Sequence, residues 1–202
     1  RDLRAELGLP PDALTVGIVA RLSPEKGHED FLFALREARA ARAGQAPVGL
    51  IIGEGPRRAE IEEEARRLGL SSDALRFTGY VDDVADAYRA LDVLVSCSRF
   101  EGLPLNLIEA MALSRTILSY DTGGCADLLA AGPAAGSDEP GVLVPRGQRQ
   151  ALAAGLVRLC GDAALRRRLA EAAGRRALSR YSLGAWADGA EAVYRDVLRR
   201  AA

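Results

Sequence analysis

Two carboxylates stand eight residues apart in the segment Arg99–Met111. Between Glu101 and Glu109 lie a Gly-Leu-Pro turn and a run of apolar residues, which together indicate a loop that turns into a helix. An apolar stretch just before them, Val93–Ser96, predicts a buried strand. A strand, a tight turn and a helix start can present backbone N–H groups and hydrogen-bond acceptors to a sugar phosphate.

Pro104 suits the first helical turn, where its missing N–H costs nothing. The neighbouring backbone N–H groups are then free to meet a phosphate or a sugar hydroxyl: those of Gly102, Leu103 and Leu105. We expect Glu101 to accept hydrogen bonds from a sugar ring and Glu109 to hold the two hydroxyls of a ribose. The spacing does not exclude the acid/base pair of a hydrolase, but a hydrolase does not need the cations described next.

Arg21 and Lys26 lie five residues apart on a predicted strand-to-helix loop. Two cations at this spacing can embrace a diphosphate, and the alternative is a pair of solvated surface charges. Of the 27 cationic residues, 26 are arginines, so Lys26 is the single compact ammonium group of the chain. A guanidinium and an ammonium are not equivalent phosphate ligands, because one is a planar fork and the other a point charge.

Two pairs of glycines also follow predicted strands. Gly53 and Gly55 would let the backbone approach a ligand, although many turns need glycine for geometry alone. They do not form a dinucleotide-binding fingerprint, because Arg58 stands where the third glycine would be. Gly123 and Gly124 precede a short helix and are either a second anion-binding turn or a plain connection.

The metal- and redox-related residues are few. His28 is the only histidine, which argues against multi-histidine metal sites, and we expect it to be a surface or capping residue rather than a catalyst. The cysteines number three and have no Cys-x-x-Cys spacing: Cys97, Cys125 and Cys160. We therefore expect free thiols and no bound metal.

Composition excludes several classes of protein. The net charge of −1 gives no basic field for nucleic acid. No apolar run reaches the roughly 20 residues of a membrane span. We expect a cytoplasmic protein. Because the 202 residues begin with Arg1 rather than Met, we also expect a piece of a longer protein.

Six predicted strands alternate with helical patterns: Thr15–Ala20, Val48–Ile52, Leu75–Phe77, Val93–Ser96, Thr116–Tyr120 and Val142–Val144. This alternation predicts an α/β fold, a Rossmann-like parallel sheet with helices on both faces. We assign residues 1–147 to that core and 148–202 to a C-terminal helical segment that packs on it. The helices of that segment are expected at about 148–159, 162–178 and 183–200, and a surface loop at 130–141.

The notable residues follow successive strands. In open parallel sheets a ligand binds beyond the carboxyl ends of the strands. Each of the first five predicted strands is followed by such a residue: Arg21, Gly53, Tyr80, Glu101 and Gly123. The sequence therefore predicts one ligand site along this edge of the sheet.

These motifs together resemble the nucleotide-sugar-binding half of retaining glycosyltransferases of the GT-B fold, in the group 1 family. The resemblance runs from about Thr15 to Tyr194 and depends on the order and spacing of six markers: Val19–Gly27, Ile52–Pro56, Phe77–Val81, Ser98–Pro104, Glu109–Ala112 and Gly123-Gly124. The chain departs from the family pattern at Ser114–Thr116, where many relatives have Gly-x-Pro, at Asp127, at Cys97 and in the length of the 130–141 loop.

The resemblance implies roles for residues in five of these six markers. Arg21 and Lys26 correspond to diphosphate ligands, Glu101 to the residue that holds the transferred sugar, and Glu109 to the ribose clamp. The backbone at Tyr80 and Val81 would face the nucleobase. Gly123 and Gly124 would lie near the distal phosphate or the sugar.

The implied reaction transfers a sugar from a nucleotide diphosphate-sugar, such as a UDP- or GDP-sugar, to a glycan, lipid or small-molecule acceptor. It needs no metal and no cofactor and retains the anomeric configuration. The acceptor-binding N-terminal domain of the family is absent, so the chain alone is expected to bind donor and turn over poorly. Peripheral contact of the full protein with the inner membrane stays open. The alternatives are a non-catalytic nucleotide-sugar or partner-binding domain and a sugar-nucleotide epimerase.

Overall fold

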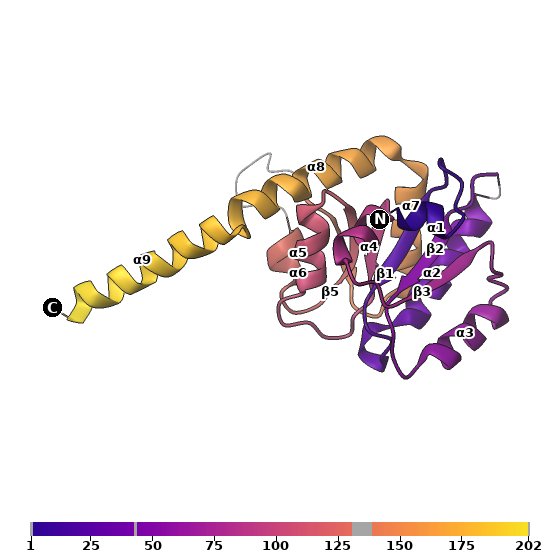
Figure 1. Ribbon diagram of the computed structural model, residues 1–202, viewed down its shortest axis with the longest axis horizontal. Helices are drawn as coiled ribbons and strands as arrows, with labels where there is room; N and C mark the ends of the chain where they lie inside the picture. The colour runs from indigo at the N-terminus through magenta and orange to yellow at the C-terminus, as the bar shows by residue number, and fades with distance from the viewer. Residues whose placement is uncertain (1, 43, 131–138, 202) are drawn as a thin grey trace.

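The computed structural model describes residues 2–42, 44–130 and 139–201. Its centre is a six-stranded parallel sheet in the order β3-β2-β1-β4-β5-β6 (Figure 1). The strands are β1 (Thr15–Val19), β2 (Val48–Ile52), β3 (Leu75–Gly79), β4 (Val93–Ser96), β5 (Thr116–Asp121) and β6 (Val142–Pro145). The expected Rossmann-like sheet is therefore confirmed.

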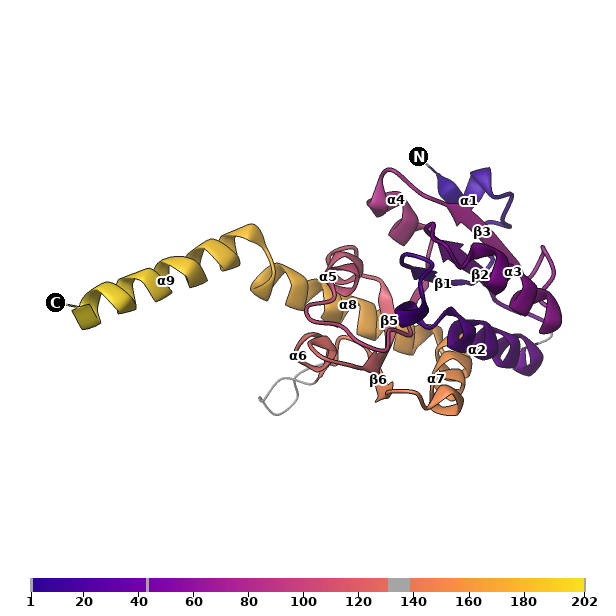
Figure 2. The same cartoon turned by 90° about the horizontal axis from the view of Figure 1, so that it is seen from below.

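Helices cover both faces of the sheet (Figure 2). Their bounds are α1 (Leu3–Glu6), α2 (His28–Ala41), α3 (Arg58–Arg67), α4 (Val84–Arg89), α5 (Leu105–Ala112), α6 (Cys125–Leu129), α7 (Arg149–Gly161), α8 (Ala163–Arg180) and α9 (Leu183–Ala201), with a 3₁₀ turn η1 at Pro24–Lys26. One apolar cluster joins the sheet to α2, α3 and α7, and a second joins it to α1, α4, α5 and α6.

The strands are apolar because both of their faces are buried. All five residues of β2 are buried. Along this strand Ile51 packs into the α2 side of the core, whereas Leu50 and Ile52 pack into the α4 side. Successive side chains of a strand point to opposite faces, so a parallel strand between two helical layers reads as a continuous hydrophobic run.

The strand order reverses between β1 and β4, which are neighbours at the centre of the sheet. β1 continues toward β2 on one side, and β4 continues toward β5 on the other. At such a switch point the loops leave the two strands in opposite directions and open a crevice. The loop with Arg21 and Lys26 follows β1 and the loop with Glu101 follows β4, so both border that crevice.

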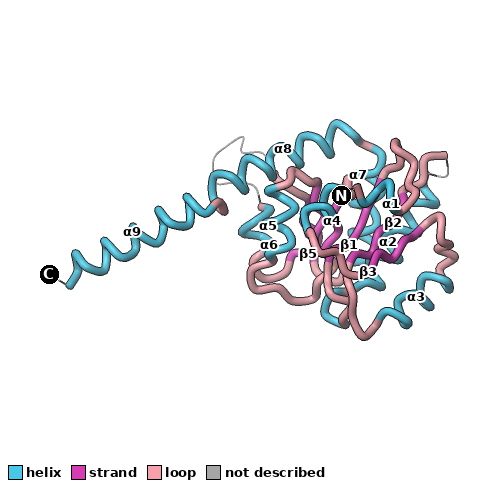
Figure 3. The backbone as a smooth tube through the Cα atoms, viewed as in Figure 1, coloured by secondary structure: helices cyan, strands magenta, loops and turns pink. Residues whose placement is uncertain are grey.

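The described part of the C-terminal region is helical (Figure 3) and contains α7, α8 and α9. α7 packs along α2, and α8 packs on α5 and β5. α9 then extends away from the body of the molecule (Figure 1). Several of its large apolar side chains are exposed, including Trp186 and Tyr194. Among the described residues no helix is long and apolar enough to cross a membrane.

Some boundaries differ from those expected. The sequence pattern predicts a helix over Phe31–Arg42. α2 begins three residues earlier, at His28, because Gly27 ends η1 in a left-handed conformation and caps the helix directly. Strand β3 extends to Gly79 rather than ending at Phe77. Helix α1 was not expected, and of the predicted 130–141 loop, residues 131–138 lie outside the described residues.

Candidate functional site

The loop after β1 is held by a buried leucine. Leu22 is fully buried, and its backbone N–H donates to the carbonyl of Glu54, 3.0 Å away. The preceding Arg21 is exposed, and no hydrogen bond or ion pair to its guanidinium occurs within the described residues. A buried anchor beside an exposed cation holds the start of the loop while leaving the guanidinium available to a ligand.

Lys26 meets Glu101 across the switch point. Its Nζ lies 2.7 Å from Oε1 of Glu101, and the two side chains are only 23% and 12% exposed. The loops that carry them are also joined through the backbone, because the N–H of Arg99 donates to the carbonyl of Glu25 at 2.8 Å. The residues predicted to hold phosphate and sugar are thus in direct contact.

The paired glycines lie against this Glu101 loop. Gly123 has φ +50°, and a Cβ added there would stand 1.6 Å from the carbonyl oxygen of Glu101. The N–H of Gly124 donates to the carbonyl of Gly102 at 3.0 Å. Only glycine fits such a close backbone approach. The Gly124 N–H is therefore engaged within the protein, and the glycine pair supports the Glu101 loop.

Pro104 precedes helix α5 rather than starting it. It is the N-cap residue, with an extended ψ of 92°, because α5 begins at Leu105. The carbonyl of Pro104 accepts from the N–H of Leu107 at 3.0 Å, which closes the first turn. The side chains of Leu103 and Leu105 are 58% and 62% exposed. Amides before the first full turn have no intrahelical acceptor, so the region stays suited to an anion or hydroxyl.

Glu109 projects from α5 toward a pocket of about 480 Å³. Its Oε2 accepts a hydrogen bond from the hydroxyl of Tyr88, 2.7 Å away. The pocket contains five of the predicted residues: Arg21, Gly53, Tyr80, Val81 and Glu109. Tyr80 is 74% exposed at its mouth. An aromatic ring, a cation and a carboxylate around one cavity match the needs of a nucleotide.

The first glycine pair is explained by its neighbours. A Cβ on Gly53 would lie 2.1 Å from the carbonyl oxygen of Ala20, and one on Gly55 would lie 2.4 Å from that of Leu22. These glycines therefore let the loop after β2 pack on the loop after β1. Gly53 also lines the pocket, whereas Gly55 does not.

The four charged side chains of the expected ligand site do not all line one cavity. Arg21 and Glu109 line the cavity, and Lys26 and Glu101 form an ion pair outside it. The two pairs are linked because Arg21 and Lys26 belong to one short loop. The site is therefore a cavity for one part of a ligand with a charged rim beside it.

Sequence reasoning missed further pocket residues: Glu54, Asp82, Tyr88 and Asn106. Asn106 stands three residues before Glu109 on α5, and residues at this spacing share a helix face. That spacing was a usable signal. Tyr88 gave no such signal, because a tyrosine in a short apolar helix is interpreted as a core residue. Glu54 lines the pocket but forms an ion pair with Arg58 at 2.8 Å.

His28 was expected at the surface, and this expectation is wrong. The side chain is fully buried, and neither ring nitrogen has a hydrogen-bond partner. Burial lowers its pKa to about 4. The starting point of α2 explains the error: with Gly27 as its N-cap, the helix begins at His28 and turns this residue into the core. Cys97, Cys125 and Cys160 are all buried free thiols, and no cluster of metal-ligating side chains occurs in the described residues.

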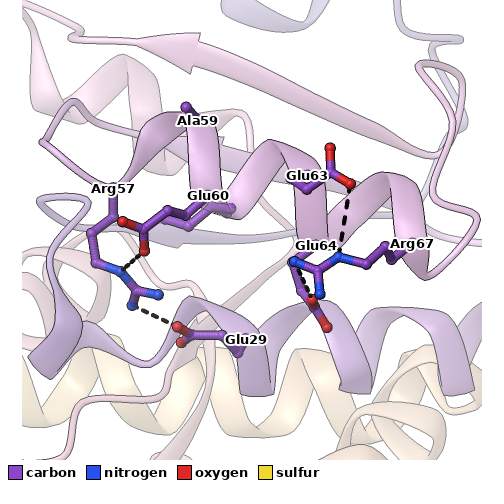
Figure 4. A pocket seen from close by; sticks show the side chains of 8 residues that line it. Glu29, Arg57, Ala59, Glu60, Glu63, Glu64 and Arg67 are labelled. Atoms are coloured by element: carbon purple, nitrogen blue, oxygen red, sulfur yellow. Dashed lines mark hydrogen bonds and ion pairs between the residues drawn. The ribbon is translucent and has the colours of Figure 1, made fainter.

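A second pocket, of about 460 Å³, lies between α2 and α3 (Figure 4). Its carboxylates are compensated by arginines. Arg57 pairs with Glu60 at 2.8 Å and with Glu29 at 2.5 Å, and Arg67 lies 3.4 Å from Glu64. None of the predicted site residues line it, so the cavity with Arg21 and Glu109 is the better candidate.

Comparisons with known proteins show which sequences and folds this chain is similar to. Residues 13–162 match the family model described as glycosyl transferases group 1. The 2-deoxystreptamine N-acetyl-D-glucosaminyltransferase of Streptomyces fradiae is 36% identical over 159 residues, which are 78% of this chain and 35% of the relative. The chain spans between 35% and 49% of the length of this and two further curated relatives.

Two solved structures share the fold. Anabaena HepE in complex with UDP superposes with a TM-score of 0.80 at 24% identity over 95% of this chain and 51% of that one. The C-terminal domain of a glycosyl transferase group 1 family protein, LpcC, from Francisella tularensis superposes with a TM-score of 0.70 at 26% identity. That match covers 84% of this chain and 87% of the domain, which was crystallised by itself.

Proposed function

Since the chain belongs to the glycosyl transferases group 1 family, we propose that it is the donor-binding half of a retaining glycosyltransferase. Its donor is a nucleotide diphosphate-sugar. The observation that carries the proposal is the position of Arg21 and Glu109 in one pocket, together with the Lys26–Glu101 ion pair between the loops that follow β1 and β4.

Each part of such a donor has a matching part of the site. The nucleoside enters the pocket, with its base at Tyr80 and Val81 and its ribose at Glu109. The diphosphate meets Arg21 and Lys26. The sugar lies at Glu101, whose free oxygen accepts from ring hydroxyls while its other oxygen stays with Lys26.

The chemistry follows from these charges. The bond between the anomeric carbon and the phosphate oxygen breaks, and its electron pair leaves with the nucleoside diphosphate. A bond forms from the same carbon to an acceptor hydroxyl oxygen, and the proton of that hydroxyl passes to the departing phosphate oxygen. Arg21 and Lys26 stabilise the departing phosphate most strongly where its charge develops, so that no metal is required.

The acceptor comes from a part of the protein outside this chain. The chain spans 35% to 49% of the length of three curated relatives, which supports an additional acceptor-binding domain at its N-terminal side. We further propose that the protein works in the cytoplasm. UDP in the HepE structure supports UDP as the first nucleotide to test.

The test has two steps. Calorimetry with the 202-residue chain measures binding of UDP, GDP and their hexose conjugates, and we expect micromolar affinity for one nucleotide series. Radiolabelled transfer is then measured with the full-length protein and its Glu101→Ala variant. Binding without transfer would favour the non-catalytic alternative, and absence of binding to both series would overturn the proposal.

A further inference from the structure

A buried tyrosine supports the carboxylate that lines the pocket. The hydroxyl of Tyr88 on α4 donates to Oε2 of Glu109 on α5 at 2.7 Å. We propose that Tyr88 is a positioning residue that holds Glu109 in the orientation required to recognise ribose. This inference rests on the proposed function and adds a residue to its site.

The tyrosine is itself fixed by packing. Its side chain is fully buried, and the ring belongs to the apolar cluster that also contains Leu91, Leu94 and Leu107. A packed aromatic ring has few rotamers, so its hydroxyl stands at a defined point. Glu109 has three side-chain torsions and would otherwise be mobile at the pocket wall.

The direction of the hydrogen bond is unambiguous. Burial, together with the neighbouring Glu109 carboxylate, raises the pKa of the Tyr88 phenol far above its usual range, so the phenol keeps its proton and donates. The length of 2.7 Å is typical of an O–H donor to a charged oxygen, which is stronger than a neutral pair.

The two oxygens of Glu109 are therefore differently occupied. Oε2 is held by Tyr88, whereas Oε1 has no hydrogen-bond partner within the described residues. A ribose hydroxyl that donates to Oε1 finds a carboxylate whose rotamer is already selected. Ordering a free side chain at binding costs conformational entropy, and this cost is avoided when the side chain is already ordered.

The consequence is specific to the ribose hydroxyls. If Tyr88 acts through Glu109, removing its hydroxyl must weaken binding of a ribonucleotide more than binding of a nucleotide that lacks the contacted hydroxyl. A tyrosine that only stabilised the fold would affect both ligands equally. The ratio of the two affinities therefore separates positioning from packing.

The variant is Tyr88→Phe, which keeps the ring and removes only the hydroxyl. Tyr120→Phe is the matched control: Tyr120 is equally buried and donates to Oδ2 of Asp30 at 2.9 Å, outside the pocket. Calorimetry of the 202-residue chain compares UDP and GDP with their 2′-deoxy and 3′-deoxy counterparts. Thermal unfolding confirms that both variants are folded at the assay temperature.

We expect the wild type to bind the ribonucleotide about tenfold more tightly than one of the deoxy forms. This factor corresponds to the loss of one hydrogen bond to a charged group. Tyr88→Phe should reduce this preference to about twofold, and Tyr120→Phe should retain it. In a Glu109→Ala background the preference is already lost, so adding Tyr88→Phe should change it no further. In the full-length enzyme Tyr88→Phe should raise the KM for donor and leave kcat nearly unchanged.

One result would overturn the inference: an unchanged ribose preference in Tyr88→Phe, whether the affinities for the ribo and deoxy forms both stay the same or both fall equally. Absence of nucleotide binding by the wild type is a different result, because it would refute the proposed function itself. Binding by the wild type without any ribose preference would remove Glu109 as the clamp, and Tyr88 with it.

Discussion

The Nζ of Lys26 and Oε1 of Glu101 lie 2.7 Å apart, although the two residues come from loops that follow different strands. The only lysine of the chain is therefore neutralised by a carboxylate before any ligand binds. A diphosphate at this rim must share Lys26 with Glu101, whereas Arg21 is exposed and available at once. Because Lys26 then touches both groups, it connects the sugar end of the site with the phosphate end.

Lys26→Ala is predicted to weaken binding of the nucleotide diphosphate by about 1–3 kcal/mol, the range for hydrogen bonds to charged groups. The loss has two sources: a phosphate ligand disappears, and the Glu101 carboxylate is left without its cation beside an anionic ligand. Calorimetry with UDP and GDP measures it.

Glu101→Gln is the matched control for that loss. It keeps the shape of the side chain, removes the negative charge and releases Lys26 to the phosphate. We expect nucleotide affinity equal to that of the wild type or up to a few-fold tighter, together with loss of sugar transfer in the full-length protein. Equal affinity in Lys26→Ala and wild type would remove Lys26 from the phosphate site.

Donor binding is predicted to survive chelation. Arg21 and Lys26 supply the positive charge that a divalent ion provides in other phosphate sites. The dissociation constant of UDP or GDP measured in EDTA should agree within about twofold with the value measured in Mn²⁺. A twofold change in affinity corresponds to only a small difference in binding free energy. A strict dependence on Mn²⁺ would contradict the metal-independent mechanism.

His28 is predicted to make the fold sensitive to acid. Its pKa is about 4 in the folded chain and about 6.5 when unfolded, so the unfolded state binds the proton first. Stability should therefore be full above pH 6.5, fall as the pH drops from 6.5 toward 4, and show no further loss from this group below that. The total loss of unfolding free energy from this group is on the order of 3 kcal/mol.

Denaturant unfolding of the wild type and of His28→Gln between pH 4 and 6.5 isolates the contribution of His28 to stability, because the carboxylates contribute equally to both proteins. The difference between the two curves should grow with pH between 4 and 6.5. A difference that does not vary with pH would mean that His28 takes up its proton in the folded chain as easily as in the unfolded one.

Ser114 is predicted to be a point of strain at the end of α5. Its φ is +52°. The Ser114 N–H donates to the carbonyl of Met111, and the Arg115 N–H donates to the carbonyl of Ala110, both at 2.9 Å. These two hydrogen bonds form a Schellman motif, in which glycine is preferred at the position of Ser114. Ser114→Gly should stabilise the chain by about 0.5–1 kcal/mol, since the αL penalty exceeds the added backbone entropy. Ser114→Ala keeps a Cβ and should give no gain in the melting temperature.

The sheet and its binding edge were predictable because they depend on local patterns. Apolar runs such as Val48–Ile52 separated by amphipathic helices define a parallel sheet, and the connection rule then places Arg21, Tyr80 and Glu101 beyond its carboxyl edge. The helix start of α2 was less predictable, since a single left-handed Gly27 decided it. The burial of His28 follows from that shift of three residues.

The sequence by itself determined which residue types follow which strands, and hence that cations, carboxylates and an aromatic ring gather at one edge. Only the tertiary structure decided the partners: Lys26 with Glu101, Tyr88 with Glu109, and Gly124 with the backbone of Gly102. The physical reason is that strand position follows from local periodicity and topology, whereas a hydrogen bond needs two atoms within about 3 Å. That precision comes from packing between elements that are far apart in the chain.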